Sequence, residues 1–181
     1  GMIRGDWTWA EGPRHGATTE RAKQYIDFAA RHGFGGVLIE GWDKGWNGDW
    51  LGHGESFSFT EPVPDFDLRA VTDYARKNKV QLIGHNETGG NIVNYESQLE
   101  AAMKLYSSLG MNSVKTGYVA HIGGIVAEGD KPGEIRMEYH EGQRMVQHHL
   151  KVVETAAKYH IAIDAHEPVK DTGLRRTYPN W

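Results

Sequence analysis

At two apolar runs, the sequence combines imidazole and carboxylate side chains. His85 and Glu87 are two residues apart, and His166 directly precedes Glu167. Each pair ends a short apolar run of the length of a β-strand. Imidazole and carboxylate groups exchange protons readily, so Glu87 could act as a general base and His85 as a hydrogen-bond donor to a substrate. A polar strand end facing water is the structural alternative, but two such pairs in equivalent positions favour a functional role.

Paired carboxylates suit two kinds of chemistry. In glycoside hydrolysis one carboxyl group donates a proton and the other activates water. Carboxylate oxygens also bind hard divalent cations. Pro168 follows Glu167, and a residue before proline is biased toward an extended conformation, which would help to fix the direction of Glu167. These residues alone leave both chemistries open.

A lysine lies in a third apolar run, at Lys115. A lysine within a strand needs a partner or a task. Lys115 could donate to sugar hydroxyls, form a Schiff base, or pair with Glu40 or Glu167. Glu40 ends another apolar run and has the same ambiguity, and Trp42 after it could stack on a sugar or merely cover the rim of the fold.

A repeated unit positions these side chains. An amphipathic helix is followed by a short turn, a β-branched run, a polar residue and a glycine-rich loop, and four copies occur. The predicted helices span residues 18–31, 68–78, 95–109 and 142–159, and the predicted strands span residues 36–40, 80–85, 113–118 and 161–166.

Helices that alternate with strands, without hairpin signals, predict parallel strands joined by right-handed crossovers. No Gly-x-Gly-x-x-Gly run or P-loop follows a strand, which disfavours an open nucleotide-binding sheet. Polar residues instead follow four different strands, as catalytic residues do in barrels. The predicted fold class is therefore α/β, a partial (β/α)8 TIM barrel with about four parallel strands, each preceded by a helix. Further units or a partner must complete such a barrel.

Composition excludes several classes of protein. Lys and Arg total 20 and Asp and Glu total 24 among 181 residues, for a formal net charge of -4. This balance gives no indication of nucleic-acid binding. No run approaches the ~20 apolar residues of a membrane-spanning helix. The absence of cysteine excludes thiol catalysis and disulfides. The 23 glycines and six tryptophans suit loops that line a concave binding face.

Two weaker candidates have structural interpretations. His148 and His149 lie on a predicted helix outside the barrel, where we expect solvated or core residues and no metal. Asp65 and Asp67 fit a turn and a helix cap better than a metal site.

The chain resembles the catalytic (β/α)8 domain of glycoside hydrolase family 97, bacterial α-glucosidases and α-galactosidases found in starch-utilisation systems. The resemblance implies that residues 1–181 form a single fragment of this domain, from after its first strand to after its fifth, the β2 to β5 region. The matching segments are residues 14–19, 25–30, 37–42, 64–68, 85–88, 114–118, 166–168 and 173–181.

The resemblance implies a periplasmic, calcium-dependent hydrolase that cleaves terminal α-glucosidic linkages of oligosaccharides. Glu87 and Glu167 match the carboxylates that activate water, and Glu167 would also bind calcium. The retaining branch uses an Asp near the end of the third strand, and residues 115–119 contain none, which favours inversion and the α-glucosidase branch. The expected sugar-binding residues are Glu40, Trp42, His85, Lys115 and His166.

In the family the general acid and another calcium ligand follow the Pro-Asn-Trp run, here residues 179–181. We therefore expect little hydrolysis by this chain alone. One alternative is a non-catalytic carbohydrate-binding or interaction module on a half-barrel, and another is a Schiff-base aldolase acting through Lys115. Unpaired strand edges near Val37 and Ile161 would also favour a homo-oligomer.

Overall fold

A four-stranded parallel sheet forms the centre of the computed structural model, which describes residues 4–120, 124–170 and 173–181. The strand order is the chain order, β1-β2-β3-β6. A doubly wound sheet reverses its order at a switch point, whereas neighbouring strands in a barrel follow the chain. The strands are β1 (Gly36–Leu38), β2 (Gln81–Glu87), β3 (Ser113–Gly117) and β6 (Ala162–Ala165).

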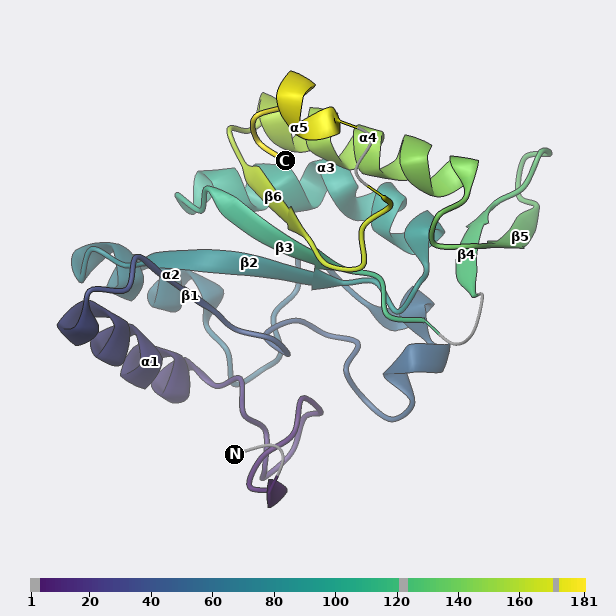
Figure 1. Ribbon diagram of the computed structural model, residues 1–181. Coiled ribbons are helices and arrows are strands. Elements are labelled where there is room, and N and C mark those ends of the chain that lie inside the picture. Colours follow the sequence, from purple (N-terminus) through teal and green to yellow (C-terminus); the bar gives the residue numbers. More distant parts are fainter. Residues whose placement is uncertain (1–3, 121–123, 171–172) are drawn as a thin grey trace.

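Four long helices connect and flank the strands (Figure 1). Side-chain caps start three of them, because Thr18, Asp67 and Asn91 each accept a backbone N–H three residues ahead. The cap at Asn91 starts its helix three residues earlier than the predicted residue 95. No helix in the described part of the chain combines the length and apolar character needed to cross a bilayer. The helices are α1 (Thr19–His32), α2 (Leu68–Lys77), α3 (Ile92–Ser108) and α4 (Gln143–Lys158).

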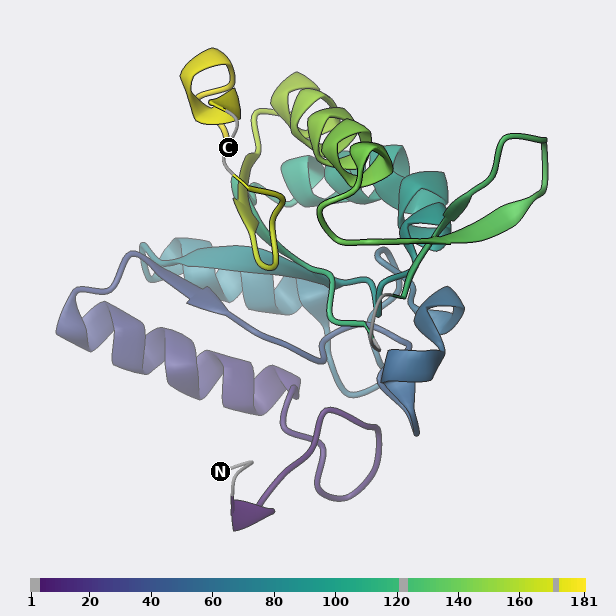
Figure 2. The same ribbon diagram turned by 45° about the vertical axis from the view of Figure 1, so that its right-hand side comes forward.

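An antiparallel hairpin corrects the prediction that hairpins are absent. Its strands, β4 (Ile125–Glu128) and β5 (Ile135–Glu138), project from the body of the fold (Figure 2). The signal was present as two short β-prone runs around a turn with Gly129 and Gly133. Shorter helical turns are η2 (Trp50–Gly52), η3 (Gly54–Ser56) and α5 (Leu174–Thr177).

Alternation along the strands sorts their side chains between two faces. Leu82, Val114 and Ile163 are buried in the main apolar cluster with residues of the helices. The adjacent positions Lys115 and Asp164 are register partners on the other face of the sheet. A second apolar cluster lies under the hairpin and contains Ile92, Tyr118, Ile125, Ala127, Met145 and Val169.

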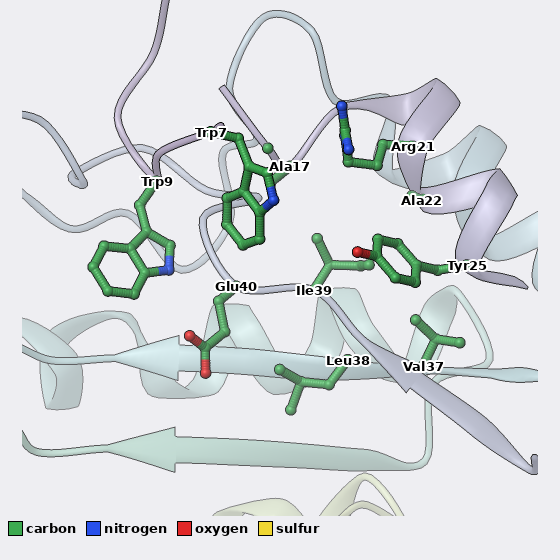
Figure 3. A pocket seen from close by; sticks show the side chains of 11 residues that line it. Trp7, Trp9, Ala17, Arg21, Ala22, Tyr25, Val37, Leu38, Ile39 and Glu40 are labelled. Carbon is green, nitrogen blue, oxygen red and sulfur yellow. The ribbon is translucent and has the colours of Figure 1, made fainter. Parts of the chain in front are cut away.

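Among the described strands, β1 and β6 form the edges of the sheet, as the sequence predicts near Val37 and Ile161. A cavity of about 330 Å³ lies beside β1, between the N-terminal segment and α1 (Figure 3). Trp7, Trp9 and Tyr25 line it. The expected homo-oligomer through these edges stays a prediction.

A buried hydroxyl group supports the fold behind the sheet. Tyr106 Oη lies 2.6 Å from Phe59 O and 2.7 Å from Asn86 Oδ1, so its single proton is shared between two buried acceptors. We expect Tyr106→Phe to reduce the free energy of unfolding by about 1–3 kcal/mol, because both acceptors lose their donor. Urea unfolding measures this. The control is Tyr159→Phe, which removes a hydroxyl bonded to Glu100 near the surface; equal losses in the two variants would contradict the prediction.

Candidate active site

The loop that leaves β3 holds the two candidate catalytic carboxylates. The Tyr118 N–H donates to Glu167 Oε2 at 2.9 Å. The next amide, Val119 N–H, donates to Glu87 Oε1 at 3.1 Å. Glu87 ends β2 and Glu167 follows β6, the two neighbours of β3. Parallel pairing therefore brings two residues 80 positions apart onto consecutive peptide groups.

Burial dominates the electrostatics of Glu87, which is 4% exposed. Burial, together with the charge of Glu167, raises the pKa of Glu87 to about 7. Hydrogen bonds from the Gly89 and Val119 amides and the charge of Lys115 oppose this rise. A carboxyl group with a pKa near neutrality is suited to general acid–base chemistry at neutral pH.

Glu167 has a different environment and a different backbone. Its side chain is 28% exposed, and its Oε1 lies 2.7 Å from His166 Nδ1. Its φ of 52° is left-handed, which corrects the extended conformation predicted from Pro168. The bonds to Tyr118 and His166 hold the carboxylate in place. A left-handed conformation at a residue other than glycine persists only where surrounding contacts determine it.

Glu40 and Lys115 form an ion pair on the inner face of the sheet, with Nζ and Oε1 2.8 Å apart. Burial raises the pKa of Glu40, but several opposing contributions, led by the hydrogen bond from Lys115, outweigh burial and hold this pKa below its ordinary value. His85 Nε2 lies 3.6 Å from the same oxygen. Burial lowers the pKa of His85 to about 4, so its imidazole is neutral at pH 7. The amine of Lys115 is ion-paired with Glu40. This pairing does not support the Schiff-base alternative.

The residues expected to bind sugar separate into two groups. Glu40, Lys115 and His166 are partly exposed. His85 is buried and stacks on Trp46 with ring centroids 5.7 Å apart. Trp42 is 3% exposed, and its Nε1–H donates to His85 O at 3.0 Å. The expectation that Trp42 stacks on a sugar is therefore corrected, because both its ring and its donor are used inside the core.

Several polar residues near this site were not singled out from the sequence. Asp164 is the register partner of Lys115 and is exposed on the same face; its spacing of two residues from His166 was the available signal. Asp43 is fully buried, accepts a bond from Trp46 Nε1, and has a pKa raised well above its ordinary value by burial. Nothing in its glycine- and tryptophan-rich surroundings marked it as buried.

The described part of the chain lacks a complete cation site. Its residues contain no group of three or more His, Asp or Glu side chains arranged to hold a metal ion. Calcium takes about 6–8 oxygen ligands, whereas the oxygens of Glu167 already contact Tyr118 and His166. The residues described here do not make a calcium site by themselves, so no step below depends on calcium.

Comparison with known proteins decides the family. The family model described as Glycoside hydrolase 97 matches residues 1–181. The chain belongs to glycoside hydrolase family 97. A solved family 97 enzyme from Pseudoalteromonas sp. strain K8, in complex with acarbose, is 54% identical with a TM-score of 0.95. The match covers 100% of this chain and 27% of that one, and it confirms the partial (β/α)8 barrel.

Two further matches also cover nearly the whole of this chain and a small part of the matched protein. A variant of the Pseudoalteromonas enzyme in complex with panose matches with the same identity, coverage and TM-score. The retaining alpha-galactosidase of Bacteroides thetaiotaomicron is 25% identical over 169 residues, which are 91% of this chain and 20% of that protein. The chain thus spans about a quarter or less of the length of these relatives.

Gly117 faces Glu87 across the register of β2 and β3. A Cβ atom at this position would overlap Glu87 Oε2 and lie 2.9 Å from its Cδ. We expect Gly117→Ala to displace the carboxylate and lower kcat by roughly tenfold or more, because small misplacements of catalytic groups slow reactions strongly. Steady-state kinetics of the full-length protein measure this. Gly35→Ala is the matched control, since its Cβ would meet nothing within 4 Å; a similar kcat in both variants would contradict the prediction.

The raised pKa of Glu87 predicts a pH-dependent stability. The folded state keeps a proton on Glu87 between its ordinary pKa of 4.5 and its folded pKa of about 7, so this group reduces stability as pH rises through that window. Glu87→Gln removes the titration. We expect the unfolding free energy of Glu87→Gln relative to the unsubstituted protein to rise by up to about 3 kcal/mol between pH 4 and pH 8. Urea unfolding at both pH values tests this, with exposed Glu20→Gln as control; a pH-independent difference contradicts it.

Proposed function

We propose that the protein containing this chain hydrolyses terminal α-glucosidic linkages, with Glu87 and Glu167 activating the attacking water. One observation carries the proposal. The two carboxylates, from different strands, are held by the consecutive amides of Tyr118 and Val119 at the ends of β2, β3 and β6. Barrel enzymes place their catalytic groups at this end of the strands.

The proposed reaction uses one of these carboxylates as the base. A water oxygen attacks the anomeric carbon while the carboxylate takes the water proton, and the bond from that carbon to the leaving oxygen breaks. The leaving oxygen is protonated by an acid to which we assign no residue of this chain. The near-neutral pKa of Glu87 and its burial support its role as a proton acceptor in a site with little water.

The inner face of the sheet supports recognition of a sugar. The Glu40–Lys115 pair presents an acceptor and a donor side by side, and His166 adds a further polar group beside Glu167. Vicinal hydroxyl groups of a sugar match such alternating donors and acceptors. We propose that these three residues bind the terminal sugar, while neutral His85 lies behind Glu40 and fixes its position.

Two features support inversion and the glucoside branch. Residues 115–119 contain no Asp where the family resemblance places the retaining nucleophile. The relative in complex with panose, an oligosaccharide of α-linked glucose units, is 54% identical. The retaining alpha-galactosidase is 25% identical. Calcium dependence follows from the resemblance alone, with Glu167 as the expected ligand.

Substitution of the carboxylates tests the proposal against a non-catalytic sugar-binding module. We expect Glu167→Gln and Glu87→Gln in the full-length protein each to lower turnover of an aryl α-glucoside by about a hundredfold or more.

Oligosaccharide binding by these variants, measured by calorimetry, should largely persist. Proton NMR of the reaction of the unsubstituted protein should show the β-anomer as first product. Glu20→Gln is the surface control. Sugar binding without turnover by the unsubstituted protein would support the binding module instead. Unchanged turnover in both site variants would contradict the assignment of Glu87 and Glu167 as bases.

A further inference from the structure

His148 lies fully buried on α4, as one of the core residues that the sequence analysis allowed on this helix. Its Nδ1 is 2.8 Å from Glu96 Oε1, and its Nε2 is 2.9 Å from the Tyr118 hydroxyl. The carboxylate can only accept, so Nδ1 carries the proton. Nε2 is then the acceptor, and the Tyr118 hydroxyl donates to it. These contacts form a directed chain from Glu96 through His148 to Tyr118.

Glu96 is a fixed, charged anchor for this chain. Arg144 donates to both of its oxygens at 2.9 and 3.0 Å, and Lys151 donates at 2.7 Å. Burial raises the pKa of Glu96, but hydrogen bonds from His148, Arg144 and Lys151 outweigh burial and hold this pKa well below its ordinary value. An ionised carboxylate with this many donors keeps its orientation, and it also fixes the tautomer of His148.

The hydroxyl, the carbonyl and the N–H of Tyr118 all form hydrogen bonds. Its side chain is fully buried in the second apolar cluster, beside β4. Its carbonyl accepts from His140 Nε2 at 2.7 Å, and its N–H donates to Glu167. The following amide, of Val119, donates to Glu87. A rotation or shift of this backbone would therefore move the donors of both candidate bases.

We infer that Tyr118 is a positioning residue for the reaction, held by His148 and Glu96 so that consecutive amides align Glu87 and Glu167. Tyr118 touches neither substrate nor water in this role; it acts through its backbone. A phenylalanine would fill the same apolar cluster, so packing alone does not account for the hydroxyl bonded to His148. That bond fixes the direction of the ring, and through it the peptide that follows. The inference rests on the proposed function.

The central test is Tyr118→Phe in the full-length protein, which removes the hydroxyl bonded to His148 and leaves the ring in place. We expect kcat to fall roughly tenfold, because misaligned bases slow the chemical step, while KM stays within about twofold because the sugar-binding groups are untouched. Tyr159→Phe is the matched control, since it removes a tyrosine–carboxylate hydrogen bond at the opposite end of α4. A kcat for Tyr118→Phe equal to that of Tyr159→Phe would overturn the inference.

Two variants of His148 separate positioning from simple packing. Asparagine can reproduce the Nδ1 contact with Glu96, and glutamine can reproduce the Nε2 contact with Tyr118. We expect His148→Gln to keep more of kcat than His148→Asn, whatever their relative melting temperatures. A kcat of His148→Asn equal to or above that of His148→Gln would overturn the inference.

Glu167→Gln, measured alongside, distinguishes this inference from the proposed function. If Glu167→Gln is inactive and Tyr118→Phe retains its full kcat, the positioning role is wrong and the proposed base stands. If Glu167→Gln keeps its turnover, the proposed function fails together with the inference that rests on it.

Discussion

Parallel pairing in chain order is the constraint on which the rest of this structure depends. Because β1, β2, β3 and β6 are neighbours in sequence order, their carboxyl ends meet at one edge of the sheet. Every polar group of the candidate site lies at or near that edge. Glu40 follows β1, and β2 lies between β1 and β3. The long Lys115 side chain reaches Glu40 across β2, because register partners on parallel strands point to the same face of the sheet. A one-residue shift of register would turn Lys115 toward the helices and separate the pair.

Burial and pairing act in opposite directions on the charges of this fold. Glu87 is buried, backbone amides are its direct donors among the described residues, and its pKa rises. Glu96 is also largely buried, but three cationic or imidazole donors surround it, and its pKa falls. The same type of side chain thus serves as a proton acceptor in one place and as a permanent charge in another. The difference lies in the donors that neighbouring elements supply.

The long connection after β3 links these two environments. Its first residue, Tyr118, joins the polar chain on α3 and α4 to the carboxylates of the site. The connection continues into the hairpin of β4 and β5, whose Ile125 and Ala127 pack in the cluster that contains Tyr118. The hairpin therefore belongs to the structure that supports the site, although it contributes no group to the reaction proposed above.

Local patterns predicted much of this fold. Helical spacing, cap residues such as Asp67 and β-branched runs located the long helices and the central strands, since these depend on neighbours in sequence. The prediction missed the hairpin, because its strands are short and pair mainly with each other. It was wrong about the backbone of Glu167, since the bonds to Tyr118 and His166 oppose the local bias of Pro168. It also misplaced Trp42, because alternation alone does not show whether a rim residue turns into the core.

The sequence by itself determined which residue types lie at strand ends, the class of fold, and the family to which the chain is similar. These properties reside in periodicity and motifs that each segment carries alone. Only the tertiary structure decided that the amides of Tyr118 and Val119 hold Glu167 and Glu87, that Lys115 pairs with Glu40, and that Glu96 reaches His148 from 52 positions away. The physical reason is that hydrogen bonds and desolvation depend on distances in space, which the packing of strands and helices sets.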